Sequence, residues 1–114
     1  MKLFIKRDQA KGLLGGVKFE LSGRVELSPA EAELVRKYKV EKELLLKKEV
    51  KIPFTGRSLS LDLTIGSLLS GQTFKCSDIA EIVETESNLK ESCESFKRYI
   101  DLMNQFGGEE VVEF

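Results

Sequence analysis

Histidine is absent from this chain of 114 residues, and cysteine occurs only twice, as Cys76 and Cys93. Histidine is the side chain best suited to proton transfer near neutral pH and the commonest ligand of transition metals. Its absence excludes serine–histidine and cysteine–histidine nucleophiles within one chain. Two cysteines without histidine also cannot complete an all-cysteine or mixed cysteine–histidine zinc site. We therefore predict no catalytic residue, no metal site and no cofactor.

Long apolar runs are absent as well. No run approaches the roughly 20 residues that span a bilayer, and the opening stretch MKLFIKRDQ lacks the apolar core of a signal peptide. These absences predict a cytoplasmic protein that does not enter a membrane. Thiols stay reduced in the cytoplasm, so we expect Cys76 and Cys93 to be packed thiols and not a disulfide.

Charge is unevenly distributed along the chain, although the net charge is only −1. Residues 1–57 hold 14 Lys and Arg against 8 Asp and Glu, a net +6, whereas residues 58–114 hold 4 against 11, a net −7. Such a division indicates either a basic binding face or two halves that interleave and cancel in the folded state.

The most motif-like stretch is KGLLGGVKFEL, residues 11–21, which lies between two predicted strands at 2–7 and 17–27. A phosphate-binding loop leads from a strand into a helix, whereas Gly12, Gly15 and Gly16 lead from one strand to the next. We therefore predict a hairpin turn here. The alternative is a contact loop that presents Leu13 and Leu14 to a partner.

A second hairpin is predicted after a short helix that begins at Ser28, where Ser28, Pro29 and Glu31 form a capping box. The hairpin pairs ELLLKKEVKIPF (43–54) with SLSLDLTI (58–65) through the turn TGRS. The expected inward-facing residues of this helix and hairpin are Leu34, Val35, Tyr38, Leu44, Leu46, Val50, Ile52, Phe54, Leu59, Leu61, Leu63 and Ile65, and Lys48 is the polar exception.

After the hairpin, Thr64 is predicted to cap one helical turn that ends near Gly71 and precedes a strand around Phe74. A long helix follows from Ser77 to Gly107, and EEVVEF (109–114) is the expected last strand. The chain therefore predicts an α+β fold in one domain, residues 1–114: a mostly antiparallel sheet built from hairpins, with one short helix and one long C-terminal helix packed on one face.

The long helix carries an apolar stripe at steps of three and four, formed by Ile79, Ile82, Leu89, Cys93, Phe96, Ile100 and Met103. Unbroken, it measures about 42 Å, longer than a small domain, so it either overhangs or breaks at TESN (85–88). Its apolar C-terminal end exceeds what one sheet face covers, which predicts a homodimer through this helix or through the exposed edge of the neighbouring C-terminal strand. The expected contact residues are Phe96, Tyr99, Leu102, Met103 and Phe106. The alternative is a helix that fills only its own sheet.

The densest basic stretch is RKYKVEKELLLKK, residues 36–48. Its candidate anion-binding residues are Arg36, Lys37, Tyr38, Lys39, Lys47 and Lys48. Basic side chains bind phosphates, and tyrosine stacks on bases. Glutamates interrupt the run, however, and the sequence pI of about 5.6 lies far below that of nucleic-acid-binding domains, so we expect no specific nucleic-acid binding.

Three functions remain open from the sequence. The first is a non-enzymatic protein that acts through self-association or through an unidentified protein partner. The second is a regulatory module that binds an anionic ligand, a nucleotide or a nucleic acid, through the basic N-terminal half. The third is a small enzyme that uses Lys75, Asp78 and Glu81 near the start of the long helix.

Overall fold

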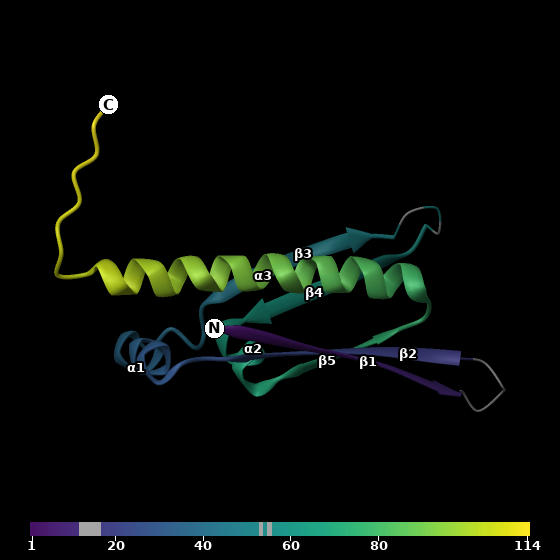
Figure 1. The fold of residues 1–114 in the computed structure, drawn as a ribbon. Helices are drawn as coiled ribbons and strands as arrows, with labels where there is room; N and C mark the ends of the chain where they lie inside the picture. Colours follow the sequence, from purple (N-terminus) through teal and green to yellow (C-terminus); the bar gives the residue numbers. More distant parts are fainter. Residues whose placement is uncertain (12–16, 53, 55) are drawn as a thin grey trace.

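Two antiparallel sheets and three helices make up the protein, for which the computed structural model describes residues 1–11, 17–52, 54 and 56–114. In chain order the elements are β1 (Lys2–Lys11), β2 (Val17–Glu26), α1 (Pro29–Tyr38), β3 (Leu44–Lys51), β4 (Ser58–Thr64), α2 (Ile65–Ser70), β5 (Gln72–Cys76) and α3 (Ile79–Gln105). The long α3 runs beside the strands of both sheets (Figure 1). The predicted α+β class is confirmed.

The first sheet has the order β1-β2-β5, with antiparallel pairing throughout. In β2, Leu21, Gly23 and Val25 are buried, and Gly23 lies against Leu89 of α3. The intervening Ser22 and Arg24 face the opposite side, as the period of two requires. The predicted turn at Gly12, Leu13, Leu14, Gly15 and Gly16 lies outside the described residues.

The second sheet is the predicted hairpin β3-β4, which stays separate from the first sheet. Leu61 and Leu63 are buried and Leu59 is half-buried, in agreement with the expected alternation. Val50 of β3 and Ile52 just beyond its end are buried, but Leu44 at the start of β3 and Phe54 are exposed, contrary to the prediction. A register irregularity between Leu44 and Leu46 interrupts the pairing at the start of β3. Phe54 lies beyond the end of the strand, where strand alternation no longer determines the facing of side chains.

Both short helices begin with the capping predicted for them. The Ser28 hydroxyl accepts a hydrogen bond from the Glu31 N–H (3.2 Å), and the Glu31 carboxylate accepts one from the Ser28 N–H (2.9 Å). The Thr64 hydroxyl accepts one from the Ser67 N–H in the same way (3.1 Å), and α2 ends at Gly71, where φ is +93°. These caps place the starts of α1 and α2 at the residues that the sequence predicts.

Of the two alternatives for the long helix, the structure shows the unbroken one, because α3 is continuous over 27 residues and residues 85–88 lie inside it. The whole chain measures 60 × 34 × 19 Å, so a helix of about 40 Å fits along its long axis. Thr85 and Asn88 are buried, and the Asn88 side-chain N–H donates to the Glu84 carbonyl (2.7 Å). The Ser92 hydroxyl donates to the Asn88 carbonyl (2.9 Å). Bonding to the preceding turn lets these polar residues occupy a helix interior.

The buried face of α3 also differs from the predicted stripe at its N-terminal end. Ile79 is exposed, whereas Glu81 is buried, because the first turn directs Glu81 toward Arg57. From Leu89 onward the prediction is correct. The main core consists of Val25, Val35, Leu63, Ile65, Leu68, Leu89, Phe96, Ile100 and Met103.

The predicted last strand is absent from the described residues, because residues 109–114 follow α3 without pairing. In Figure 1 this segment leads away from the body of the molecule. Its apolar side chains Val111, Val112 and Phe114 are exposed. The glutamates and the apolar residues of EEVVEF are therefore exposed to solvent together.

Candidate functional site

The predicted anion-binding residues of α1 and its C-cap lie at the end of that helix. Arg36 pairs with Glu33 one turn earlier, and the Lys37 ammonium lies 5.3 Å from the centre of the Tyr38 ring. Tyr38 is half-buried and packs against Phe106, with ring centres 5.4 Å apart. Lys39 takes the left-handed C-cap position with φ of 54°. The tyrosine face therefore contacts its own chain.

The remaining two predicted residues, Lys47 and Lys48, lie on β3 and not on α1. Lys48 forms an ion pair with Glu91 of α3 (3.4 Å), and both lysines border a hollow that also contains Glu49 and Asp62. Arg36 borders a different hollow, which contains Glu26 and Glu41. The six residues are thus divided between two elements and have acidic neighbours, so no single anion site joins them in these hollows.

The predicted interface residues are divided by depth. Phe96 and Met103 are buried in the chain's own core, whereas Tyr99 is half-buried and Leu102 and Phe106 are exposed. Leu102 borders two hollows of about 440 and 490 Å³. The hollow of about 440 Å³ lies between α3 and β3 and is also lined by Leu44, Leu45 and Tyr99. The hollow of about 490 Å³ is also lined by Phe106. We call Leu44, Leu45, Tyr99, Leu102 and Phe106 the C-terminal apolar surface.

A partly buried ionic cluster, in which Glu81 is the buried member, joins the second hairpin to the start of α3. Arg57 donates to Glu81 (2.8 Å) and also pairs with Asp78, while the Ser77 N–H donates to Glu81 (2.6 Å). The Glu81 N–H, which donates to Asp78 (3.0 Å), and the Arg57 guanidinium hold the pKa of Asp78 below its usual value. Sequence reasoning missed Arg57, because a lone arginine in a turn has no pattern that identifies its partner.

This cluster does not have the form of the enzyme site considered above. Lys75 is exposed and lies opposite Glu20 on the side of the sheet away from α3, since its neighbour Cys76 faces the core. Glu81 already accepts two hydrogen bonds, one from Arg57 and one from the Ser77 backbone. Arginine remains protonated at neutral pH, so it offers no base. The arrangement is suited to holding two elements together.

The two cysteines are unpaired. Burial raises the pKa of Cys76, whose sulfur lies 3.9 Å from the Thr85 hydroxyl, and the nearby carboxylates of Glu81 and Asp78 raise it further. Burial raises the pKa of Cys93 to about 11. Both groups are protonated at neutral pH, and a thiol is a much weaker nucleophile than a thiolate.

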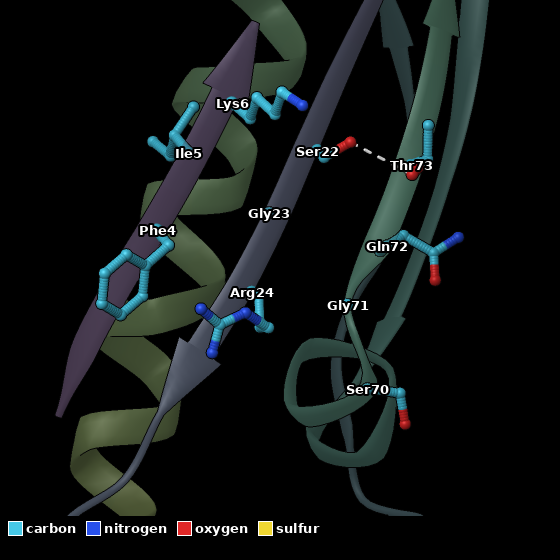
Figure 2. A pocket seen from close by; sticks show the side chains of 10 residues that line it. All are labelled: Phe4, Ile5, Lys6, Ser22, Gly23, Arg24, Ser70, Gly71, Gln72 and Thr73. Atoms are coloured by element: carbon cyan, nitrogen blue, oxygen red, sulfur yellow. Dashed lines mark hydrogen bonds between the residues drawn. The ribbon is translucent and has the colours of Figure 1, made fainter.

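A further hollow of about 510 Å³ lies on the face of the β1-β2-β5 sheet opposite α3 (Figure 2). We call it the open-face hollow. Arg24 lies over the Phe4 ring, 4.7 Å from its centre, and Lys6 lies two pairs further along the same two strands, on the same face. The hydroxyls of Ser22 and Thr73 are hydrogen-bonded to each other (3.1 Å). Sequence reasoning missed this site, because its residues come from three separate strands.

Comparisons of the chain with protein-family models, with curated proteins and with solved structures find no match. None of the helices in the described part of the chain combines the length and the apolar character that crossing a membrane requires. Over the same residues, no three acidic or thiol side chains come together as metal ligands would.

Proposed function

We propose that the protein acts without catalysis, through contacts with other protein chains, and that its first partner is a second copy of itself. The observation that carries this proposal is the C-terminal apolar surface. Leu102 is 56% exposed at the junction of two hollows, and Leu44 and Phe106 beside it are exposed too. If a partner covers this surface, the apolar area removed from water contributes about 25 cal/mol per Å² to the free energy of association.

Self-pairing is the simplest way to cover such a surface. In a two-fold dimer the same patch meets itself, so one apolar surface is sufficient for both copies. The positions support this geometry, because Tyr99 and Leu102 lie three residues apart on one face of α3, and Phe106, four positions further on, is the C-cap residue of the same helix. Phe106 is further fixed by its ring contact with Tyr38.

Sedimentation equilibrium of the full chain between about 1 and 200 μM tests the proposal, in the range where weak dimers dissociate. We expect a dimer whose mass falls toward that of the monomer in Leu102→Glu. The matched control is Val83→Glu, because Val83 lies on the same helix and is 58% exposed but is distant from the C-terminal apolar surface. Circular dichroism of both variants checks that they fold.

The outcomes separate clearly. A dimer that Leu102→Glu disrupts and Val83→Glu preserves supports the proposal. A monomer mass at every concentration of the unaltered chain contradicts self-association. A dimer that survives Leu102→Glu contradicts the proposed surface.

A further inference from the structure

The open-face hollow has charge and shape features that differ from those of the C-terminal apolar surface. We propose that it binds residues 109–114, EEVVEF, of a second copy of the chain. The inference rests on the proposed self-association and specifies a second contact within it. It identifies both the receiving residues and the segment that enters.

The receiving side offers positive charge beside an aromatic ring. Among the residues that line the open-face hollow, Lys6 and Arg24 are charged and both are cationic. Phe4 is 44% exposed although it is a large apolar side chain, and the Arg24 guanidinium covers part of its ring. The hydroxyls of Ser22 and Thr73 add hydrogen-bonding capacity on the adjoining strands. A ligand that combines carboxylates with apolar groups fits this set.

Acidic neighbours do not neutralise the two cations. Lys6 approaches Asp8 at 3.7 Å and Arg24 approaches Glu26 at 3.6 Å, each two residues along its own strand. All four side chains are about half exposed or more, and exposed pairs of this kind contribute less than about 1 kcal/mol. An incoming carboxylate therefore competes with a weak pair.

The segment 109–114 supplies the complementary chemistry. Glu109, Glu110 and Glu113 carry three negative charges, and Val111, Val112 and Phe114 are exposed apolar side chains. Six extended residues reach about 20 Å, which is enough to cross three strands spaced about 4.8 Å apart. Glu109 and Glu110 border the hollow beside Leu102 and Phe106 of their own chain, and the segment then leads away from the body in Figure 1, which favours a second copy as the receiving molecule.

A peptide with the sequence of residues 108–114, blocked at both ends, tests the contact on the full ¹⁵N-labelled chain at low micromolar concentration. We expect amide shifts at Phe4, Lys6, Ser22, Arg24 and Thr73. Arg24→Glu is expected to weaken peptide binding about ten-fold, since it replaces an attractive charge by a repulsive one. Lys90→Glu is the matched control, because Lys90 is an exposed lysine on α3, which packs on the other face of this sheet. A peptide with glutamine at all three glutamate positions is expected to bind about ten-fold more weakly as well.

Each remaining outcome is decisive. Shifts at Tyr99 and Leu102, or equal binding by Arg24→Glu and Lys90→Glu, overturn the assignment of the hollow. The Phe114→Ser variant is also compared with the unaltered monomeric chain in the absence of peptide. If this substitution changes the amide shifts of residues in the open-face hollow, the chain's own segment occupies the hollow, which overturns the role of a second copy. Absence of peptide binding at millimolar concentration overturns the inference, whereas dimerisation that depends on Leu102 then still stands. A monomer in sedimentation overturns the proposed function, and the peptide titration still reports on the hollow.

Discussion

Gly23 of β2 lies directly beneath Leu89 of α3, so closely that a methyl group on Gly23 would overlap the leucine side chain. Leu89 is fully buried and cannot move aside without disturbing the core around it. The glycine thus allows the long helix to approach the sheet. This contact explains a glycine in the middle of a ten-residue strand, where glycine otherwise weakens the structure.

We expect Gly23→Ala to lower the free energy of unfolding by about 1–3 kcal/mol through overpacking. Urea denaturation followed by circular dichroism measures the change. The test of the mechanism is a double-mutant cycle, because Leu89→Ala creates the space that the new methyl group needs. Gly23→Ala should therefore cost less in the Leu89→Ala background, and an equal cost in both backgrounds would show that Leu89 is not the cause.

Arg57 provides a second test, since it connects the β3-β4 hairpin to α3 through Glu81. Glu81 is only 5% exposed, so Arg57→Gln leaves a buried carboxylate with the Ser77 N–H alone. We expect a loss of about 1–3 kcal/mol in the free energy of unfolding. The control is Arg36→Gln, because the Arg36–Glu33 pair is exposed on both sides and should contribute less than about 0.5 kcal/mol. Similar losses in the two variants would contradict the importance of burial.

The sequence predicts those parts of the fold that depend on interactions between residues close in sequence, and it does not predict those that depend on contacts between distant segments. Capping at Ser28 and Thr64 and the alternation of Leu59, Leu61 and Leu63 depend on residues close in sequence, and the structure agrees with them. The division into two sheets depends on which strands pair at long range. The local sequence of a strand does not determine which distant strand it pairs with.

In the described residues α3 has no break at residues 85–88, which the sequence had left open, and the predicted last strand is missing; long-range packing decides both. Local propensity disfavours Thr85 and Asn88 inside a helix, but their burial, the contact of Thr85 with Cys76 and the bond of Asn88 to the preceding turn outweigh it. Residues 109–114 have strand-like composition without a neighbouring strand to pair with in the described chain. The open-face hollow is the part that is hardest to predict from the sequence, because Phe4, Arg24 and Thr73 come together only after the three strands have paired.

Stability should decrease in acid. The Ser28 N–H holds the pKa of Glu31 below its ordinary 4.5, and the Glu81 N–H and Arg57 hold that of Asp78 below 3.8. A lowered pKa in the folded state means that the unfolded chain takes up protons first as pH falls. The stabilisation from these carboxylates is present above about pH 4.5 and is lost as pH falls through their folded pKa values. Urea denaturation between pH 2 and 7 measures it, and Glu31→Gln with Asp78→Asn should flatten the curve. An unchanged slope in that double variant would contradict these two groups as its source.

Asn88 offers the last test, because its side-chain oxygen is buried without a hydrogen-bond partner among the described residues. Its side-chain N–H bonds to the Glu84 carbonyl, a bond that stays within the helix and does not connect α3 to a sheet. An unpartnered buried carbonyl costs about 1–3 kcal/mol, and leucine has nearly the same branched shape without that group. We expect Asn88→Leu to raise the free energy of unfolding by about 1 kcal/mol and Asn88→Asp to lower it, since a buried carboxylate is costlier still. Urea denaturation of both variants at pH 7 measures these changes. If Asn88→Leu instead destabilises the chain by 1 kcal/mol or more, the oxygen has a partner in solution, and a polar contact at this position is part of what keeps α3 continuous.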